Sequence, residues 1–358
     1  MTFPIPVTVL SGFLGSGKTT VLKHLLKRPD MAGTAVIVNE FGEVGLDDAL
    51  LEATQEEMVT LPSGCICCAV RGDLVKALTG LADRVMCGDV ERLDRIVIET
   101  TGLADPAPIA HTLITDQDLF RLFQFDGIAV TVDAELAAHQ IEAHVEPARQ
   151  IAVADRLLIT KTDRAPSEAV AAMEKRLSRL NPGAARRVVV AGVCRPEDVF
   201  GLEAFEPTAV KAHAEGWLAA SAYSQTDQPT HCSVADCGHD HTQGHRHGSD
   251  DARGHLHGLE SFCLTYDTPL DGRKLSFALE LLRQTYGERL LRLKGIVHIA
   301  GEEQPFVVHG VQHVFYPPAP IDGDLARADP RSRLVFIVKD LKPEQVRTIF
   351  TPLGNETT

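Results

Sequence analysis

A glycine-rich stretch near the N-terminus has the residue types and spacing of a phosphate-binding loop. It reads GFLGSGKTT over residues 12–20 and contains the pattern G-x-x-x-x-G-K-[ST]. Glycines let backbone N–H groups curl around phosphate oxygens, and a following helix N-terminus adds partial positive charge. Lys18 is expected to reach the β- and γ-phosphates, and the Thr19 hydroxyl to coordinate Mg²⁺. The residues predicted to contact a nucleotide here are Gly12, Gly15, Ser16, Gly17, Lys18, Thr19 and Thr20.

Three cysteines within four residues form a second group with chemical potential: Cys65, Cys67 and Cys68. So short a loop strains disulfide geometry, so pairing among them is not expected. As thiolates they could converge on one soft or borderline cation, for which Zn²⁺ is the default. A run of buried small hydrophobic residues is the alternative. The spacing is unlike a packing period, and three ligands leave one coordination position open, which suits a site that releases its metal.

Acidic residues that follow predicted strands could sense the nucleotide. The run at 34–38 predicts a strand that ends in NEFG, and Glu40 and Glu43 are candidate switch or metal-coordinating groups. A solvated loop is an equal alternative for each of them taken alone. The run at 95–100 predicts another strand, in which Glu99 takes the place of the acid that handles Mg²⁺ or the attacking water.

Two further residues could approach the phosphates. Gly102 would let the backbone come close to a γ-phosphate. Arg71 lies between the cysteines and a helix that Asp73 is predicted to cap, so Arg71 could face a phosphate or be an ordinary surface charge.

A short element after a later strand resembles the guanine-reading pattern N-K-x-D. It consists of Thr160, Lys161, Thr162 and Asp163. The aspartate would accept hydrogen bonds from guanine N–H groups that adenine does not offer, and the lysine stem would pack on the base. Thr160 replaces the usual asparagine, which is expected to weaken the tie between this element and the phosphate-binding loop.

The elements that position these residues alternate as in an α/β protein. An apolar run at 5–10 precedes the phosphate-binding loop, and residues 21, 22, 25 and 26 form one apolar helix face after it. This context argues against a glycine-rich turn that binds nothing. The predicted fold class is α/β, a P-loop NTPase domain with a mostly parallel sheet, followed by a smaller C-terminal α+β domain.

Composition sets the class of protein and the domain count. The 358 residues suffice for two domains, and 44% of them are hydrophobic. A net charge of -14 argues against nucleic acid as the main partner. No apolar run approaches a membrane span, and the N-terminus lacks a signal peptide pattern, so a cytoplasmic protein is expected. The eight cysteines are then expected to be thiols or metal ligands.

A tract rich in histidine divides the chain. Residues 231–257 contain many of its 15 histidines and almost no large apolar residues, which predicts a disordered linker. Such a tract could capture Zn²⁺, Cu or Ni²⁺ weakly, or simply aid solubility. Its candidate auxiliary ligands are His231, Cys232, Cys237, His239, His241, His245 and His247. The predicted parts are a nucleotide-binding domain at 1–217, the linker at 218–257 and an α+β domain at 258–358.

The combined pattern closely resembles the CobW-like family of P-loop GTPases, which act in metal homeostasis and metallocofactor assembly. The motifs that carry the resemblance are GFLGSGKTT at 12–20, NEFG at 39–42, GCICC at 64–68, ETTGLADP at 99–106 and TKTD at 160–163. The resemblance implies a slow GTPase that uses GTP, GDP and Mg²⁺. It also implies a metal site at the three cysteines whose affinity depends on the nucleotide.

The expected function is a metallochaperone that loads Zn²⁺, or Co²⁺, and passes it to a client protein docked on the C-terminal domain. Hydrolysis would release the two nucleotide-sensing stretches and so change the cysteine geometry. A metal buffer with a regulatory nucleotide site is the alternative. A small-molecule kinase is a third hypothesis, but it gives the cysteines no role. The sequence leaves the metal, the client and the oligomeric state open, a homo-oligomer included.

Overall fold

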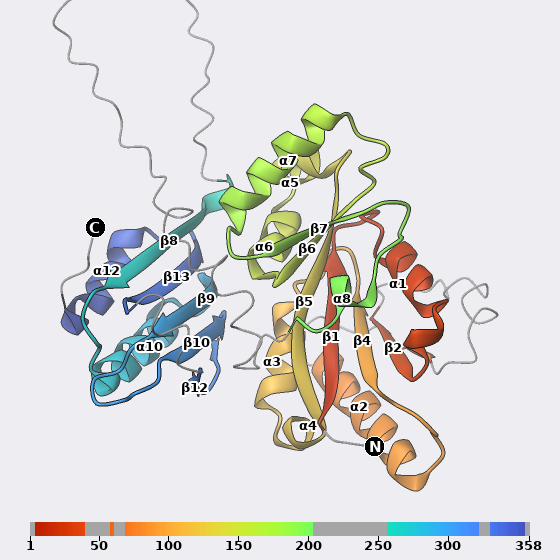
Figure 1. The fold of residues 1–358 in the computed structure, drawn as a ribbon, viewed down its shortest axis with the longest axis horizontal. Coiled ribbons are helices and arrows are strands. Elements are labelled where there is room, and N and C mark those ends of the chain that lie inside the picture. The colour runs from red at the N-terminus through yellow and green to blue at the C-terminus, as the bar shows by residue number, and fades with distance from the viewer. Residues whose placement is uncertain (1–3, 40–57, 61–68, 203–255, 322–329, 355–358) are drawn as a thin grey trace, which may run out of the picture.

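The structure is a computed structural model that describes residues 4–39, 58–60, 69–202, 256–321 and 330–354 (Figure 1). Two sheets of different construction lie side by side in it. The first belongs to the N-terminal half of the chain and the second to the C-terminal half. The predicted domain limits at 217 and 257 fall in or beside the stretch 203–255, which lies outside the described residues, so these limits stay predictions.

The first sheet has seven strands in the order β3-β2-β4-β1-β5-β6-β7, and all of its neighbours pair in parallel. Its strands are β1 (Ile5–Gly12), β2 (Thr34–Asn39), β3 (Met58–Thr60), β4 (Arg95–Thr100), β5 (Phe123–Asp133), β6 (Arg156–Thr160) and β7 (Ala185–Val189). The central strands β1, β4 and β5 are buried along almost their whole length because a parallel sheet is covered on both faces. The carboxyl ends of β1, β4 and β6 therefore lie at one edge, where the sequence predicts the nucleotide.

Helices cover both faces of this sheet. They are α1 (Lys18–Leu26), α2 (Ala69–Cys87), α3 (Ala107–Thr115), α4 (Gln117–Leu122), α5 (Ala137–Ala143), α6 (Val145–Val153), α7 (Ser167–Leu180) and α8 (Pro196–Val199). Alternate strand residues serve different faces. Ile37 and Ile98 share a core with α2, α3, α5, α6 and α7, whereas Val36 and Val97 share one with α1 and α8.

The start of α2 differs from the sequence prediction. The helix begins at Ala69, so Asp73 lies inside it and does not cap it. Ala69, Val70 and Arg71 contain no helix breaker, so the helix can extend through them toward its N-terminus. As a result, the helix starts directly after Cys68.

The second sheet is antiparallel, with the order β11-β10-β9-β13-β8 and with β12 beside β10. Its strands are β8 (Leu259–Tyr266), β9 (Leu290–Val297), β10 (Phe306–Val311), β11 (Val314–Phe315), β12 (Ala319–Pro320) and β13 (Ser332–Lys339). Helices α10 (Gly272–Tyr286) and α12 (Pro343–Phe350) pack on one face around Phe336 and Phe350. Pro343 opens the last helix, as its fixed φ favours. The predicted fold class is confirmed.

The other face of the second sheet packs on the first domain. Its buried residues Leu259, Leu291, Val311, Tyr316 and Ile337 belong to the same apolar core as α3, α6 and the first sheet. The two domains are thus joined by continuous packing. In the described part of the chain, no helix is long and apolar enough to cross a bilayer.

A buried ionic contact reinforces the junction of the two domains. Arg292 on β9 hydrogen bonds to the Asp155 carboxylate and to the Val153 carbonyl at the end of α6. Lys294 Nζ lies 3.0 Å from Asp155 Oδ1. Burial of Asp155 favours its neutral form, but Arg292 and Lys294 outweigh that effect and lower the pKa of this carboxyl to about 2. Burial, together with the charge of Arg292, lowers the pKa of Lys294 to about 8.

Candidate functional site

The phosphate-binding loop has the backbone shape that its glycines predict. Gly12, Gly15 and Gly17 all have positive φ, the last as the N-cap of α1. A Cβ on Gly12 would lie 2.3 Å from Thr131 Oγ1, so only glycine fits there. No described side chain caps α1, which leaves its first N–H groups to face a ligand.

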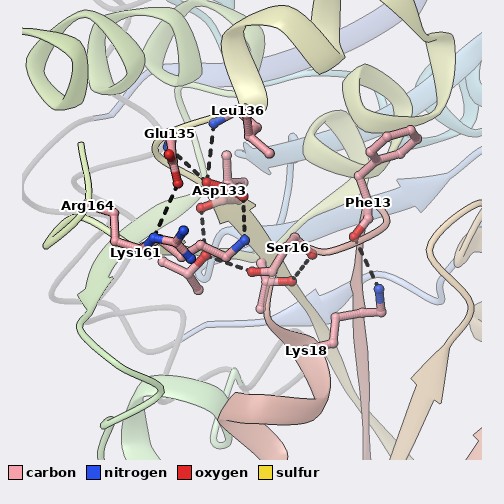
Figure 2. Close-up of polar contacts among 11 residues, drawn as sticks. Phe13, Ser16, Lys18, Asp133, Glu135, Leu136, Lys161 and Arg164 are labelled. Carbon is pink, nitrogen blue, oxygen red and sulfur yellow. Dashed lines mark hydrogen bonds and ion pairs between the residues drawn. The ribbon is translucent and has the colours of Figure 1, made fainter. Parts of the chain in front are cut away.

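Lys18 and Thr19 open helix α1 at the edge of the sheet. Lys18 is 9% exposed, and its Nζ donates to the Gly12 carbonyl at 2.8 Å. It also donates to the Phe13 carbonyl at 3.3 Å, as Figure 2 shows. The Thr19 hydroxyl donates to Glu99 Oε1 at 2.7 Å. Glu99 is buried at the end of β4, beside β1. The structure therefore brings together the lysine, the hydroxyl and the acid that the sequence singled out.

Gly102 lies against the phosphate-binding loop. A Cβ at this position would lie 2.6 Å from the backbone nitrogen of Leu14, so the close approach needs glycine. Gln150 on α6 holds the loop that carries Gly102, because its Nε2 donates to the carbonyls of Gly102 at 3.1 Å and Ala104 at 2.9 Å. Gln150 is 1% exposed. Nothing in the sequence around Gln150 pointed to this contact.

The element at 160–163 is tied to the phosphate-binding loop more directly than the sequence predicted. Thr160 was predicted to weaken the tie to the phosphate-binding loop, but its buried hydroxyl donates to the Ser16 carbonyl at 2.7 Å. The hydroxyl is also 3.2 Å from the Val132 carbonyl. A threonine hydroxyl thus makes the link for which an asparagine was expected.

Lys161 and Asp163 present the rest of this element. Lys161 has φ 57 and pairs with the buried Asp133 at 2.7 Å, as Figure 2 shows. Asp133 Oδ1 also accepts from the N–H groups of Glu135 and Leu136. Asp163 is exposed, so its carboxylate can accept from a base. Sequence reasoning missed Asp133, although an acid at the carboxyl end of a predicted strand was a usable signal.

Thr20 and Arg71 were also predicted to contact the nucleotide. Thr20 lies exposed on α1, beside the turn that contains Gly192. The backbone of Arg71 lies on α2, but the structure does not describe its side chain, so the contact of Arg71 with a phosphate stays a prediction.

The predicted transition-metal ligands, unlike the Mg²⁺ ligand Thr19, fall outside the described residues. These are Cys65, Cys67, Cys68, Glu40, Glu43 and the linker residues His231, Cys232, Cys237, His239, His241, His245 and His247. Within the described ranges, no three His, Cys, Asp or Glu side chains are grouped to hold a metal. The residues beside these stretches are placed: β2 ends at Asn39, β3 ends at Thr60 and α2 begins at Ala69.

Comparisons with known proteins cover almost the whole chain. Residues 6–187 match the CobW/HypB/UreG nucleotide-binding domain, and residues 259–352 match the cobalamin synthesis protein CobW C-terminal domain. The zinc chaperone YjiA of Escherichia coli (strain K12) is 34% identical over 350 residues, which is 98% of this chain and 99% of YjiA.

Two further matches extend this likeness. The zinc-regulated GTPase metalloprotein activator 1 of Schizosaccharomyces pombe is 36% identical over 185 residues, which is 50% of this chain and 44% of that relative. The crystal structure of Zn(II)-bound YjiA GTPase from E. coli superposes with a TM-score of 0.71 at 30% identity. It covers 99% of this chain and 100% of the YjiA chain.

Proposed function

The chain belongs to the CobW family, and from that premise we propose that it is a GTP-hydrolysing metallochaperone that holds one transition metal on Cys65, Cys67 and Cys68. The prediction of a P-loop GTPase agrees with the fold and with relatives that are named GTPases. Zn²⁺ is the proposed cargo, because the relatives are named for zinc and thiolates suit it, with Co²⁺ as the second choice. We also propose that the protein acts in the cytoplasm.

The observation that carries the proposal is the contact of Thr19 with Glu99 at the carboxyl edge of the sheet. A hydroxyl and a carboxylate 2.7 Å apart form a hard oxygen pair of the kind that Mg²⁺ prefers. When bound there, Mg²⁺ would neutralise charge on the β- and γ-phosphates. Lys18 would bind the same phosphates, and Gly102 would face the γ-phosphate. Glu99 would also orient the attacking water.

The position of the chain around the cysteines supports coupling between metal and nucleotide. Residues 61–68 join Thr60, at the end of β3, to Ala69, at the start of α2. In a parallel sheet, β3 ends at the same edge as β1 and β4, where the nucleotide residues lie. A γ-phosphate bound at that edge could therefore alter the cysteine geometry. The released metal would pass to a client protein docked on the C-terminal domain.

Metal and GTP should change each other's affinity by the same factor, about 5–150-fold. The measurement is Zn²⁺ and Co²⁺ affinity with GDP and with a non-hydrolysable GTP analogue. Replacing the three cysteines with serine should remove the tight metal site and leave GTP binding intact. Loading should also release protons, because thiols must ionise to bind metal. A triple variant that still binds one metal tightly, with affinity set by the nucleotide, contradicts the proposal.

A metal buffer with a regulatory nucleotide site is the alternative function. A variant without residues 231–255 separates the two, because a buffer would lose most of its metal capacity. The metallochaperone would keep its single tight site.

Asp163→Asn should weaken GTP binding by about 10- to 150-fold, because a hydrogen bond to a charged acceptor is lost. Xanthosine nucleotides should bind better to this variant, since the asparagine amide can donate to the xanthine oxygen. Affinities for GTP, XTP and ATP test this. Equal affinity of the unaltered protein for ATP and GTP would show that residues 160–163 do not select guanine.

A further inference from the structure

The loop at residues 101–106 connects the nucleotide site to the second domain. At one end it follows Glu99 and contains Gly102, which packs on the backbone of Leu14. At the other end it contains Asp105, whose Oδ1 accepts from the N–H of Ala107, the first residue of α3. A displacement of this loop would therefore alter the surroundings of the γ-phosphate.

Two glutamines from different domains hold this loop. Gln150 of the first domain holds the carbonyls of Gly102 and Ala104. Gln312 of the second domain donates from Nε2 to Asp105 Oδ2 at 2.9 Å, across 207 residues of sequence. The loop is thus fixed from α6 on one side and from the C-terminal sheet on the other.

Gln312 occupies a strained position at the tip of the β10–β11 hairpin. Its φ angle is 52°, in the left-handed region that a non-glycine residue seldom occupies unless the surrounding structure stabilises it there. Its neighbour His313 lies against His111 of α3, with ring centroids 4.8 Å apart. Two successive residues of the hairpin tip therefore contact the loop and the helix that follows it.

The hairpin is held in place relative to the first domain. Arg292 on β9, the strand beside β10, bonds to Asp155 and to the carbonyl of Val153. Val153 ends α6, the same helix that carries Gln150. Helix α6, which carries Gln150, is therefore hydrogen bonded to the sheet whose β10–β11 hairpin carries Gln312.

We propose that Gln312 is a positioning residue for GTP hydrolysis: through Asp105, the C-terminal domain holds the loop that presents Gly102 to the γ-phosphate. This inference rests on the proposed GTPase function and adds a second-domain residue to it. A partner that binds the C-terminal domain and moves the hairpin would then change the rate of hydrolysis without touching the nucleotide.

Gln312→Glu tests the inference in the full-length protein, because it sets two carboxylates against each other at the contact. The rate constant of GTP hydrolysis under single-turnover conditions should fall about 2- to 30-fold, the range seen for residues that couple sites at a distance. Affinity for GDP should stay as in the unaltered protein, since GDP lacks the γ-phosphate that Gly102 faces.

Combining Asp105→Asn with Gln312→Glu should restore a hydrogen bond between the two positions, with residue 105 now the donor and residue 312 the acceptor. The asparagine Nδ2 can donate to the new glutamate, while its Oδ1 can still accept from the N–H of Ala107. The double variant should recover most of the lost rate, and Asp105→Asn alone completes the double-mutant cycle. Gln304→Glu is the matched control, because Gln304 is exposed on the turn between β9 and β10. It should hydrolyse GTP at the unaltered rate.

The outcomes separate this inference from the proposed function. An unaltered protein that does not hydrolyse GTP refutes the GTPase proposal itself. Where it does, a Gln312→Glu rate equal to that of Gln304→Glu overturns the positioning role. Rate losses that merely add in the cycle overturn it as well, because they show no coupling between Gln312 and Asp105.

Discussion

Asp155→Asn is expected to lower the free energy of unfolding at pH 7 by about 3–5 kcal/mol, the usual cost of removing one partner from a buried ion pair. The Asp155 and Arg292 side chains are each 6% exposed, and Lys294 is 13% exposed. Without the carboxylate, the two cations would lose the negative charge that both of them contact in the domain junction. Urea unfolding of both proteins measures the difference.

The cost should depend on pH in a defined direction. The pKa of Asp155 falls from an ordinary 3.8 to about 2 in the folded protein. The folded form therefore keeps its charge between pH 4 and 2 while the unfolded chain takes up a proton, so this stabilisation is complete above pH 4 and is lost toward pH 2. The difference between the unaltered protein and Asp155→Asn should shrink over the same interval. A constant difference across it would contradict the assignment.

Glu280→Ala provides the control, because Glu280 also has a lowered pKa of about 2, caused by its hydrogen bonds to Arg283 and Gln284. The Glu280 and Arg283 side chains are 47% and 40% exposed, so water and salt screen the pair. The urea midpoint should hardly change in Glu280→Ala. The same pKa thus has different consequences at a buried and at an exposed position.

Lys18→Ala should reduce GTP hydrolysis by at least about 100-fold and weaken nucleotide binding, because a buried cation directed at the phosphates is lost. In the structure Lys18 Nζ is held by the Gly12 and Phe13 carbonyls, so its position is set before the nucleotide arrives. Single-turnover hydrolysis and GTP affinity are the measurements. Lys23→Ala, on the same helix and farther from the loop, is the control for loss of a positive charge.

Glu99→Gln completes this comparison. It removes the charge beside Thr19 but retains an acceptor for its hydroxyl, so turnover should fall more than nucleotide affinity. Unchanged turnover would remove the proposed role of Glu99 in orienting water. Hydrolysis by Lys18→Ala at the rate of Lys23→Ala would show that the loop is not the phosphate site.

Much of the fold could be predicted from the sequence because its signals are local. Most strands of the first sheet contain short apolar runs, and the loop from Gly12 to Thr19 combines a motif with its strand and helix. The start of α2 could not be placed, because the preference of Asp73 for a cap is weaker than the continuation of the helix from Ala69. Capping preferences rank positions, but they do not forbid a longer helix.

The site could be predicted only for residues that belong to short local sequence motifs. Lys18, Thr19, Glu99 and Gly102 come from motifs, and the structure places them together. No local sequence pattern marks Gln150 or Gln312, because each contacts a residue that is distant in the sequence. Gln150 is 48 residues from Gly102, and Gln312 is 207 residues from Asp105. The link from Thr160 to Ser16 depends on a distance that residue types alone do not give.

The shared core of the two domains also bears on how this chain can evolve. Leu259, Leu291, Val311, Tyr316 and Ile337 pack into the first domain, and Arg292 bonds to it. The buried side chains of this junction therefore suffice to set the relative position of the two domains that the stretch from 203 to 255 connects. Selection on the domain geometry leaves that stretch free to gain or lose residues. A histidine-rich insertion could thus be acquired, lengthened or discarded between relatives without redesign of either sheet.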